Sequence, residues 1–325
     1  MEKSTKSNDK LKKLLKSQRA VAFIALIIIY GFFYIMSPAF RSKETLTSIF
    51  DSSYYAGFLA IGVTFTIATG GFDLSMGTAM IASALIGGYV SQKFNIPIGI
   101  TIIIIILTGL LFGCFNGFLI TKMGINPFIA TLGTQMIANG LGSIVTNVQT
   151  VNFPLRDSPQ GWYKSIFRIG SFPTGIILLL VVAIIMGIIL HKMRLGRYIL
   201  ALGSNKEATR LSGINVNKYE FLAYALNGLF VGFAAVAYAA TYTTVMPGEG
   251  SGFELDAIAA AVLGGTSLQG GVASITGTVL GLFIMTILKV GLPFIDLQAH
   301  YQTFITGFVI LLAVYLDVVR NRNKN

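Results

Sequence analysis

Charged residues leave long gaps along this chain of 325 residues, and these gaps restrict its fold more than any other feature. Only 11% of the residues are charged, whereas a soluble globular domain carries roughly a quarter. A helix needs about 20 apolar residues to cross the hydrocarbon of a bilayer. Eight uncharged stretches are close to or above that length: 20–40, 52–72, 74–92, 94–121, 123–155, 169–190, 221–248 and 257–288. The sequence therefore predicts an all-α polytopic membrane protein, because helices satisfy their own backbone hydrogen bonds in lipid.

The basic residues behind the net charge of +11 gather beside these stretches. Seventeen of the 24 lysines and arginines lie before residue 20, at Lys122, between residues 191 and 219, and in the last six residues. The positive-inside rule places all four segments in the cytoplasm. Nucleic acid is a poor partner for such a chain, because the basic residues adjoin apolar spans and lack interleaved aromatic residues.

Two cytoplasmic ends require an even number of membrane crossings. We expect about ten, near residues 20–36, 51–69, 74–91, 97–120, 126–146, 172–190, 220–242, 256–268, 272–291 and 301–319. This count leaves the segments 147–171 and 243–255 outside the cell.

The sequence contains no low-complexity linker and no soluble domain. We therefore expect a basic cytoplasmic tail at 1–19, one transmembrane domain at 20–319, and a short cytoplasmic tail at 320–325. The transmembrane domain would include the cytoplasmic loop 191–219.

Two glycine motifs share one pattern. Residues 70–77 and 264–271 both read GG-x-x-L-x-x-G, and each interrupts an apolar stretch. Glycine adopts backbone angles that break a helix, and paired breaks in two halves of a chain are typical of internal repeats and a translocation path. The alternative is a chance match in a chain with 36 glycines. The pattern predicts helix breaks at Gly70, Gly71, Gly77, Gly264, Gly265 and Gly271.

Asp73 lies between two uncharged stretches. An ionised group inside a membrane costs about 2.5–3.5 kcal/mol on insertion scales, so its presence needs a reason. Asp73 is either a residue of the pathway or of proton coupling, or the N-cap of a helix that begins at Leu74.

Four further polar residues are candidates for lining the pathway: Asn116, Asn126, Gln135 and Asn139. Gln135 and Asn139 are four residues apart and so share one helix face. The alternative for each is a hydrogen bond between helices, which is common in membrane bundles.

The cytoplasmic loop contains a capping box, in which Ser204 and Glu207 bond each other's backbone amides at a helix start. Gly213 predicts the end of this short helix. A capped helix that stands off the membrane suits docking into a partner, although it is equally suited to a solvated connection. The docking candidates are Ser204, Asn205, Lys206, Glu207, Ala208, Arg210, Leu211 and Gly213.

The chain lacks the motifs of an enzyme. It contains no G-x-x-x-x-G-K-[ST], so ATP would have to bind another polypeptide. It also contains no HExxH pair, no metal–diphosphate motif and no arrangement of catalytic residues. We therefore expect a transport subunit with no catalytic residue, no metal and no bound cofactor.

Four segments resemble, in the same order, the permeases of ribose-type sugar ABC importers: GFDLSMG at 71–77, KMGINPFIATLGT at 122–134, 195–214 and 253–271. Phe72 and Met76 replace the isoleucine and valine that are usual there. The resemblance implies a second permease subunit, ATPase subunits that hold ATP and Mg²⁺ and dock on a coupling helix near 205–213, and an extracytoplasmic binding protein that delivers a simple sugar, ribose being the first expectation.

Two other functions stay open at this point. A secondary transporter would couple sugar to protons through Asp73, with Lys289 as its partner. A membrane enzyme would act on lipid-linked sugars, but the sequence lacks the paired acidic or metal-binding residues that this chemistry requires.

Overall fold

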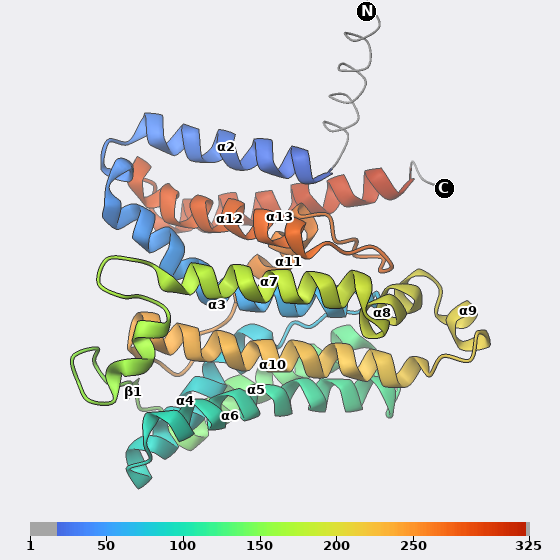
Figure 1. The fold of residues 1–325 in the computed structure, drawn as a ribbon, viewed down its shortest axis with the longest axis horizontal. Helices are drawn as coiled ribbons and strands as arrows, with labels where there is room; N and C mark the ends of the chain where they lie inside the picture. The colour runs from blue at the N-terminus through green and yellow to red at the C-terminus, as the bar shows by residue number, and fades with distance from the viewer. Residues whose placement is uncertain (1–17, 323–325) are drawn as a thin grey trace, which may run out of the picture.

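The computed structural model describes residues 18–322, so most of the two predicted tails lies outside the described residues. The described chain is a bundle of helices (Figure 1). Its long helices are α2 (Gln18–Met36), α3 (Lys43–Ala68), α4 (Met76–Phe94), α5 (Ile98–Thr121), α6 (Pro127–Thr146), α7 (Thr174–Lys192), α10 (Val216–Tyr242), α12 (Ile275–Gly291) and α13 (Ala299–Arg322). The shorter elements are η1 (Ala39–Arg41), β1 (Val151–Asn152), η2 (Gly161–Ile166), α8 (Arg194–Ser204), α9 (Lys206–Leu211), β2 (Thr244–Val245), α11 (Phe253–Leu263) and η3 (Leu292–Ile295).

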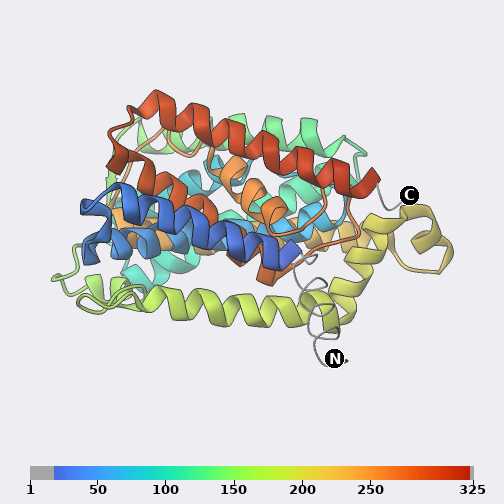
Figure 2. The ribbon, with the colours of Figure 1, turned by 90° about the horizontal axis from the view of Figure 1, so that it is seen from above.

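The long helices run in roughly the same direction, and the two ends of the bundle differ (Figures 1 and 2). Helices α8 and α9 project from one end, where α2 begins and α13 finishes. Strand β1 and the segment around η2 lie at the opposite end. These two ends are called the α9 end and the β1 end of the bundle below.

Five helical segments of the described chain are long and apolar enough to cross a membrane: α5, α6, α7, α10 and α12 continued by η3. The outward faces of α6 and α7 expose many large apolar side chains. Monomeric soluble proteins rarely expose contiguous apolar patches of this extent. These features are those of a multi-pass membrane protein.

Each of the ten predicted crossings overlaps a helix, although the helix at the crossing predicted near 256–268, α11, ends at Leu263. Helix α11 has 11 residues and is therefore about 16 Å long, roughly half the thickness of the hydrocarbon. The helix ends just before Gly264 and Gly265, and the φ of +100° at Gly265 lies outside helical conformation.

Helix α10 lies against α5 along much of its length, and glycines allow this close packing. Gly109 and Gly113 of α5 are spaced like Gly228 and Gly232 of α10. A Cβ on Gly113 would lie 2.5 Å from the Cα of Gly228. Such small residues four apart let membrane helices approach backbone to backbone, so α5 and α10 form one firm layer of the core.

A small sheet ties two distant segments together at the β1 end. β1 pairs antiparallel with β2, with Val151 opposite Val245. The amide of Phe153 donates to the carbonyl of Thr243 at 2.7 Å, and the buried ammonium of Lys164 donates to the Thr243 hydroxyl. These contacts hold the segment that leads from α10 into α11.

The buried Lys164 should make the stability of the folded protein depend on pH. Burial, together with the nearby Arg156, lowers the pKa of Lys164 from 10.5 to about 8. Between about pH 8 and 10.5 the folded state thus binds fewer protons than the unfolded state, so this group stabilises the fold progressively as the pH rises through that window. We expect the thermal midpoint of the detergent-solubilised protein to rise more steeply from pH 8 to 10 than that of Lys164→Met.

The exposed Lys93 supplies the control for this measurement. Lys93→Met should keep the pH profile of the unaltered protein. Identical profiles for the unaltered protein and Lys164→Met would contradict the assignment of this pH dependence to Lys164.

Candidate functional site

The first turns of α4 and α11 meet inside the bundle, and glycines permit the contact. A Cβ on Gly77 would lie 2.5 Å from Oε2 of Glu254 and would overlap the carbonyl oxygen of Gly250. Gly250 itself has a φ of +105°, which favours glycine. Buried carboxylates accompany both helix starts, Asp73 before α4 and Glu254 in α11. Negative charge is favourable at a helix N-terminus, because the first amides and the helix dipole face it.

Asp73 is 2% exposed and receives hydrogen bonds from three residues. Its Oδ1 accepts from the amide of Ser75 at 2.9 Å and from the Ser75 hydroxyl at 2.7 Å. The Asn227 side-chain amide donates to Oδ2 at 2.7 Å, and that of Asn116 donates to Oδ1 at 3.3 Å. The structure thus brings together two predicted candidates, Asp73 and Asn116, and adds Asn227 from α10.

The prediction that Asp73 caps the helix after it is wrong. Helix α4 begins at Met76, and Ser75 occupies the N-cap position without a capping side-chain bond. Asp73 instead bonds within its own turn and to two neighbouring helices, because it lies two residues before that cap.

The ion pair expected for a proton-coupled transporter is also wrong. Lys289 pairs with Asp256 of α11 and not with Asp73. The described partners of Asp73 are neutral hydroxyl and amide groups.

Glu254 contacts a second predicted candidate. Its Oε1 accepts from the amide of Gly252 at 3.0 Å and from the side-chain amide of Gln135 at 3.0 Å. Its buried Oε2 has no hydrogen-bond partner among the described residues. Gln135 is therefore a residue of the bundle centre, where it links α6 to α11.

The other two candidates on α6 lie away from this contact. Asn126 is exposed and caps α6, because its side chain accepts from the amide of Phe128 at 2.9 Å. Asn139 is half-buried, one turn beyond Gln135.

Sequence reasoning missed the residues that correspond at the two helix starts. Residues 71–74 read Gly-Phe-Asp-Leu and residues 252–255 read Gly-Phe-Glu-Leu. This short match contains the two buried carboxylates, Asp73 before α4 and Glu254 in α11. Asn227 carries no comparable signal, because only the packing of α10 brings it to Asp73.

The two GG motifs lie next to each other near the α9 end of the bundle. The chain leaves helical conformation at both, since α3 ends at Ala68 and α11 ends at Leu263. The amide of Gly271 donates to the carbonyl of Ala68 at 3.0 Å, which joins the two breaks directly. The positive φ angles of Gly70, +83°, and Gly271, +74°, allow the turns.

The end of helix α8 completes this contact, which we call the glycine junction (Ala68, Gly70, Gly203, Gly270 and Gly271). A Cβ at Gly203 would overlap the carbonyl oxygen of Ala68 and lie 2.5 Å from the amide nitrogen of Gly271. The backbone of α8 therefore touches both breaks without an intervening side chain. Helix α9 follows α8 directly in the chain.

The capping prediction for α9 is wrong by one residue. Asn205, not Ser204, is the N-cap, and its side chain accepts from the amide of Ala208 at 2.9 Å. Ser204 is the last residue of α8, so its backbone cannot take the extended form of an N-cap. Glu207 pairs with Arg210 at 3.4 Å instead of reaching back.

The predicted end of α9 is confirmed. The helix ends at Leu211, and Gly213 follows with a φ of +80°. The side chains of Ala208 and Leu211 are exposed on its outer surface, and Lys206 bonds to Glu220 at 2.8 Å.

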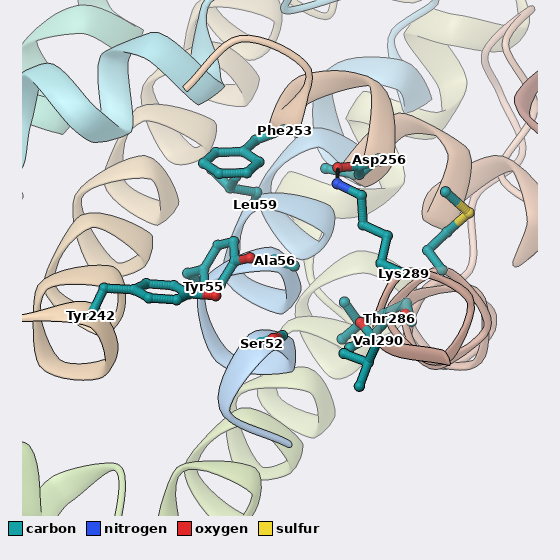
Figure 3. A pocket seen from close by; sticks show the side chains of 13 residues that line it. Ser52, Tyr55, Ala56, Leu59, Tyr242, Phe253, Asp256, Thr286, Lys289 and Val290 are labelled. Carbon is teal, nitrogen blue, oxygen red and sulfur yellow. Dashed lines mark hydrogen bonds and ion pairs between the residues drawn. The ribbon is translucent and has the colours of Figure 1, made fainter. Parts of the chain in front are cut away.

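A cavity of about 210 Å³ lies between α3, α10, α11 and α12 (Figure 3). It is on the side of the bundle nearer to β2, since Tyr242 at the end of α10 lines it. The rings of Tyr55, Tyr242 and Phe253 lie on one side, and Asp256 and Lys289 face each other across from them (Figure 3). We refer to it below as the aromatic cavity.

These features define a polytopic membrane protein whose helix starts and polar groups meet inside the bundle, an arrangement that is typical of membrane transport proteins. Residues 45–314 match the family model described as "Branched-chain amino acid transport system / permease component", and the chain belongs to this family. No solved structure matches the chain.

Individual relatives are similar over nearly their whole length. The chain is 36% identical over 303 residues to the "Ribose import permease protein RbsC" of Escherichia coli (strain K12), which covers 91% of this chain and 92% of that protein. It is 35% identical over 304 residues to the protein of the same name from Bacillus subtilis (strain 168), with 92% of each covered. It is 30% identical over 318 residues to the "Galactose/methyl galactoside import permease protein MglC" of Escherichia coli (strain K12), with 93% and 94% covered.

Proposed function

We propose that this chain is the membrane-spanning permease of an ABC importer that moves a simple sugar, of the ribose or galactose kind, into the cell. The observation that carries the proposal is the identity of 30–36% to ribose and galactose import permeases over more than nine-tenths of both chains. The family description names branched-chain amino acids instead. The individual relatives favour a sugar, because their similarity extends along the whole chain.

We infer ten passages of the chain through the membrane, of which the one at α11 is part helix and part extended backbone. The α9 end is then cytoplasmic, since Lys122 and the basic segment 191–219 require it. Both termini would lie on that side. The extended backbone beside α11 is acceptable at membrane depth because protein surrounds it.

We infer further that the two halves of the chain form an inverted repeat. Helix α4 of the first half packs on α10 of the second half, and α11 of the second half packs on α3 of the first half. The Gly-Phe-acidic-Leu sequences at 71–74 and 252–255 precede or begin corresponding helices. Helix starts that meet at the middle of a repeat are typical of transporter sites.

Energy reaches this chain from a separate ATPase subunit that holds ATP and Mg²⁺ and docks on α9. Two features support this: the sequence lacks an ATP-binding loop, and α9 exposes Ala208 and Leu211 between charged residues. The glycine junction would carry the motion of α9 into both helix breaks.

Three further partners complete the importer. A second permease subunit would share the pathway, an extracytoplasmic binding protein would deliver the sugar at the β1 end, and lipid would surround the outer helices. Four of the candidates would lie along the pathway or support it: Asp73, Asn116, Gln135 and Asn139. Asn126 instead caps helix α6.

The test is ATP-dependent sugar uptake into proteoliposomes that contain the chain with its ATPase and binding-protein partners. We expect uptake of D-ribose or D-galactose when ATP is present with the ATPase, and background uptake when the ATPase carries an inactivating substitution. A matched reaction without ATP but with an imposed pH gradient should also give background. Uptake driven by the pH gradient alone would overturn the proposal.

A further inference from the structure

We propose that the aromatic cavity is a low-affinity binding site for one monosaccharide ring on its way through the permease. This inference rests on the proposed function, since a sugar must be the transported solute. Four helices from both halves of the chain line the site. A ligand held there therefore contacts elements that must move relative to each other during transport.

The aromatic side of the cavity is a preformed surface for the apolar face of a sugar. Tyr55 lies at the centre of a ring cluster, with ring centroids 5.8 Å from Tyr242 and 5.5 Å from Phe253. Tyr238 joins the same cluster at 5.3 Å from Tyr55. Rings held in mutual contact lose little conformational freedom when a ligand binds. They form a rigid apolar face on which the C–H bonds of a sugar ring can pack.

The opposite side of the cavity matches the hydroxyl groups of the same ligand. The carboxylate of Asp256 accepts hydrogen bonds, and the ammonium of Lys289 donates them. Each sugar hydroxyl can do both, so neighbouring hydroxyls can bond one member of the ion pair each. The pair has no net charge, which suits a neutral ligand, and Ser52 and Thr286 add hydroxyl groups to the lining.

The ion pair also stands between two cavities. Phe253, Asp256 and Lys289 line both the aromatic cavity and a second space of about 550 Å³ that reaches α13 at Gln302 and Thr306. A sugar that bonds the pair from one side can thus pass to the other when the pair separates. Affinity has to be low at such a point, because a site on a pathway must release its ligand.

The experiment measures protection of a cysteine placed in the cavity. The sequence holds one cysteine, Cys114, which is first replaced by serine. Ser52→Cys then puts a thiol in the aromatic cavity, and Ser158→Cys puts a matched thiol in a separate cavity near β1. The assembled importer in proteoliposomes is labelled with a small maleimide in the presence of D-ribose, D-galactose or L-leucine.

We expect the transported sugar to slow labelling of Ser52→Cys and leave Ser158→Cys unchanged. Occupancy alone slows labelling about threefold when the free sugar is at about twice its Kd. L-Leucine should not protect. Protection by L-leucine in place of sugar, or sugar uptake without any protection of Ser52→Cys, would overturn the site; the second outcome leaves the proposed function intact. Absence of ATP-dependent sugar uptake by the unaltered importer would instead overturn the function.

Substitutions give a second readout. Tyr242→Leu should raise the KM for sugar uptake several-fold, with ATPase activity of the assembled importer retained. Tyr34→Leu is the matched control, since Tyr34 on α2 is 46% exposed and Tyr242 is 45% exposed. Equal KM values for these two variants would contradict a sugar-stacking role for the ring cluster.

Discussion

Asp73→Ala is expected to prevent the permease from accumulating as a folded protein. The substitution leaves three buried donors without their acceptor: the amide and hydroxyl of Ser75 and the side-chain amide of Asn227. The side-chain amide of Asn116 loses its longer bond to Asp73 and keeps the one to the Ser75 hydroxyl. Each orphaned donor costs about 1–3 kcal/mol, so the sum is comparable to the whole stability of a typical domain, about 5–15 kcal/mol. The measurement is the yield of monodisperse protein after detergent extraction, with its thermal midpoint.

Asn227→Asp tests the same cluster by changing a hydrogen-bond donor of Asp73 instead of Asp73 itself. It would bring a second carboxylate to the position that now donates to Asp73 at 2.7 Å, and two such anions repel strongly in a buried site. Asn217→Asp is the matched control, because Asn217 is exposed near the start of the same helix. A normal yield and midpoint for both Asp73→Ala and Asn227→Asp would show that the cluster does not stabilise the fold.

Gly203→Val is expected to uncouple ATP hydrolysis from sugar uptake. Even a Cβ at this position overlaps the carbonyl oxygen of Ala68, so α8 must move away from both helix breaks. Overpacking of this kind costs about 1–3 kcal/mol, occasionally more, and backbone cannot rotate aside as a side chain can. We expect the assembled importer to keep its ATPase activity while sugar uptake falls by about tenfold or more, which corresponds to at least about 1.4 kcal/mol.

Gly31→Ala controls for the substitution of a helical glycine. Gly31 is on α2, and a Cβ there would meet no atom within 4 Å. This variant should transport normally and gain slightly in helix stability. Normal coupling in Gly203→Val would exclude the glycine junction as the link between α9 and the core. Loss of both ATPase activity and assembly would likewise contradict a specific uncoupling.

The long helices were predictable because each follows an apolar stretch of the sequence, whereas helix α8 (Arg194–Ser204) was not predicted. Uncharged stretches marked their positions, and Gly213 marked the end of α9 correctly. The predicted helix boundary was wrong where the capping residue depends on neighbouring structure. Ser204 could not cap α9 because it is the last residue of α8. The half-length of α11 was not predictable from the spacing of charges, because the uncharged stretch continues past the end of the helix to residue 288.

The centre of the bundle was predictable only in part. Asp73 stood out because a charge in an apolar region is costly, and Asn116 and Gln135 stood out as polar residues in spans. Their pairing depends on tertiary packing. Asn227 is 154 residues from Asp73, and Glu254 is 119 residues from Gln135. The aromatic residues that line the aromatic cavity, such as Tyr55, could not be predicted because they look like ordinary core residues in the sequence.

The long separation between Asp73 and Asn227 also bears on biosynthesis. The ribosome has to make α10 before the carboxylate meets its shortest amide partner, which donates at 2.7 Å. A polypeptide cut short before α10 would keep the buried carboxylate of Asp73 without this partner, and its first half should therefore be less stable than the same residues in the complete chain.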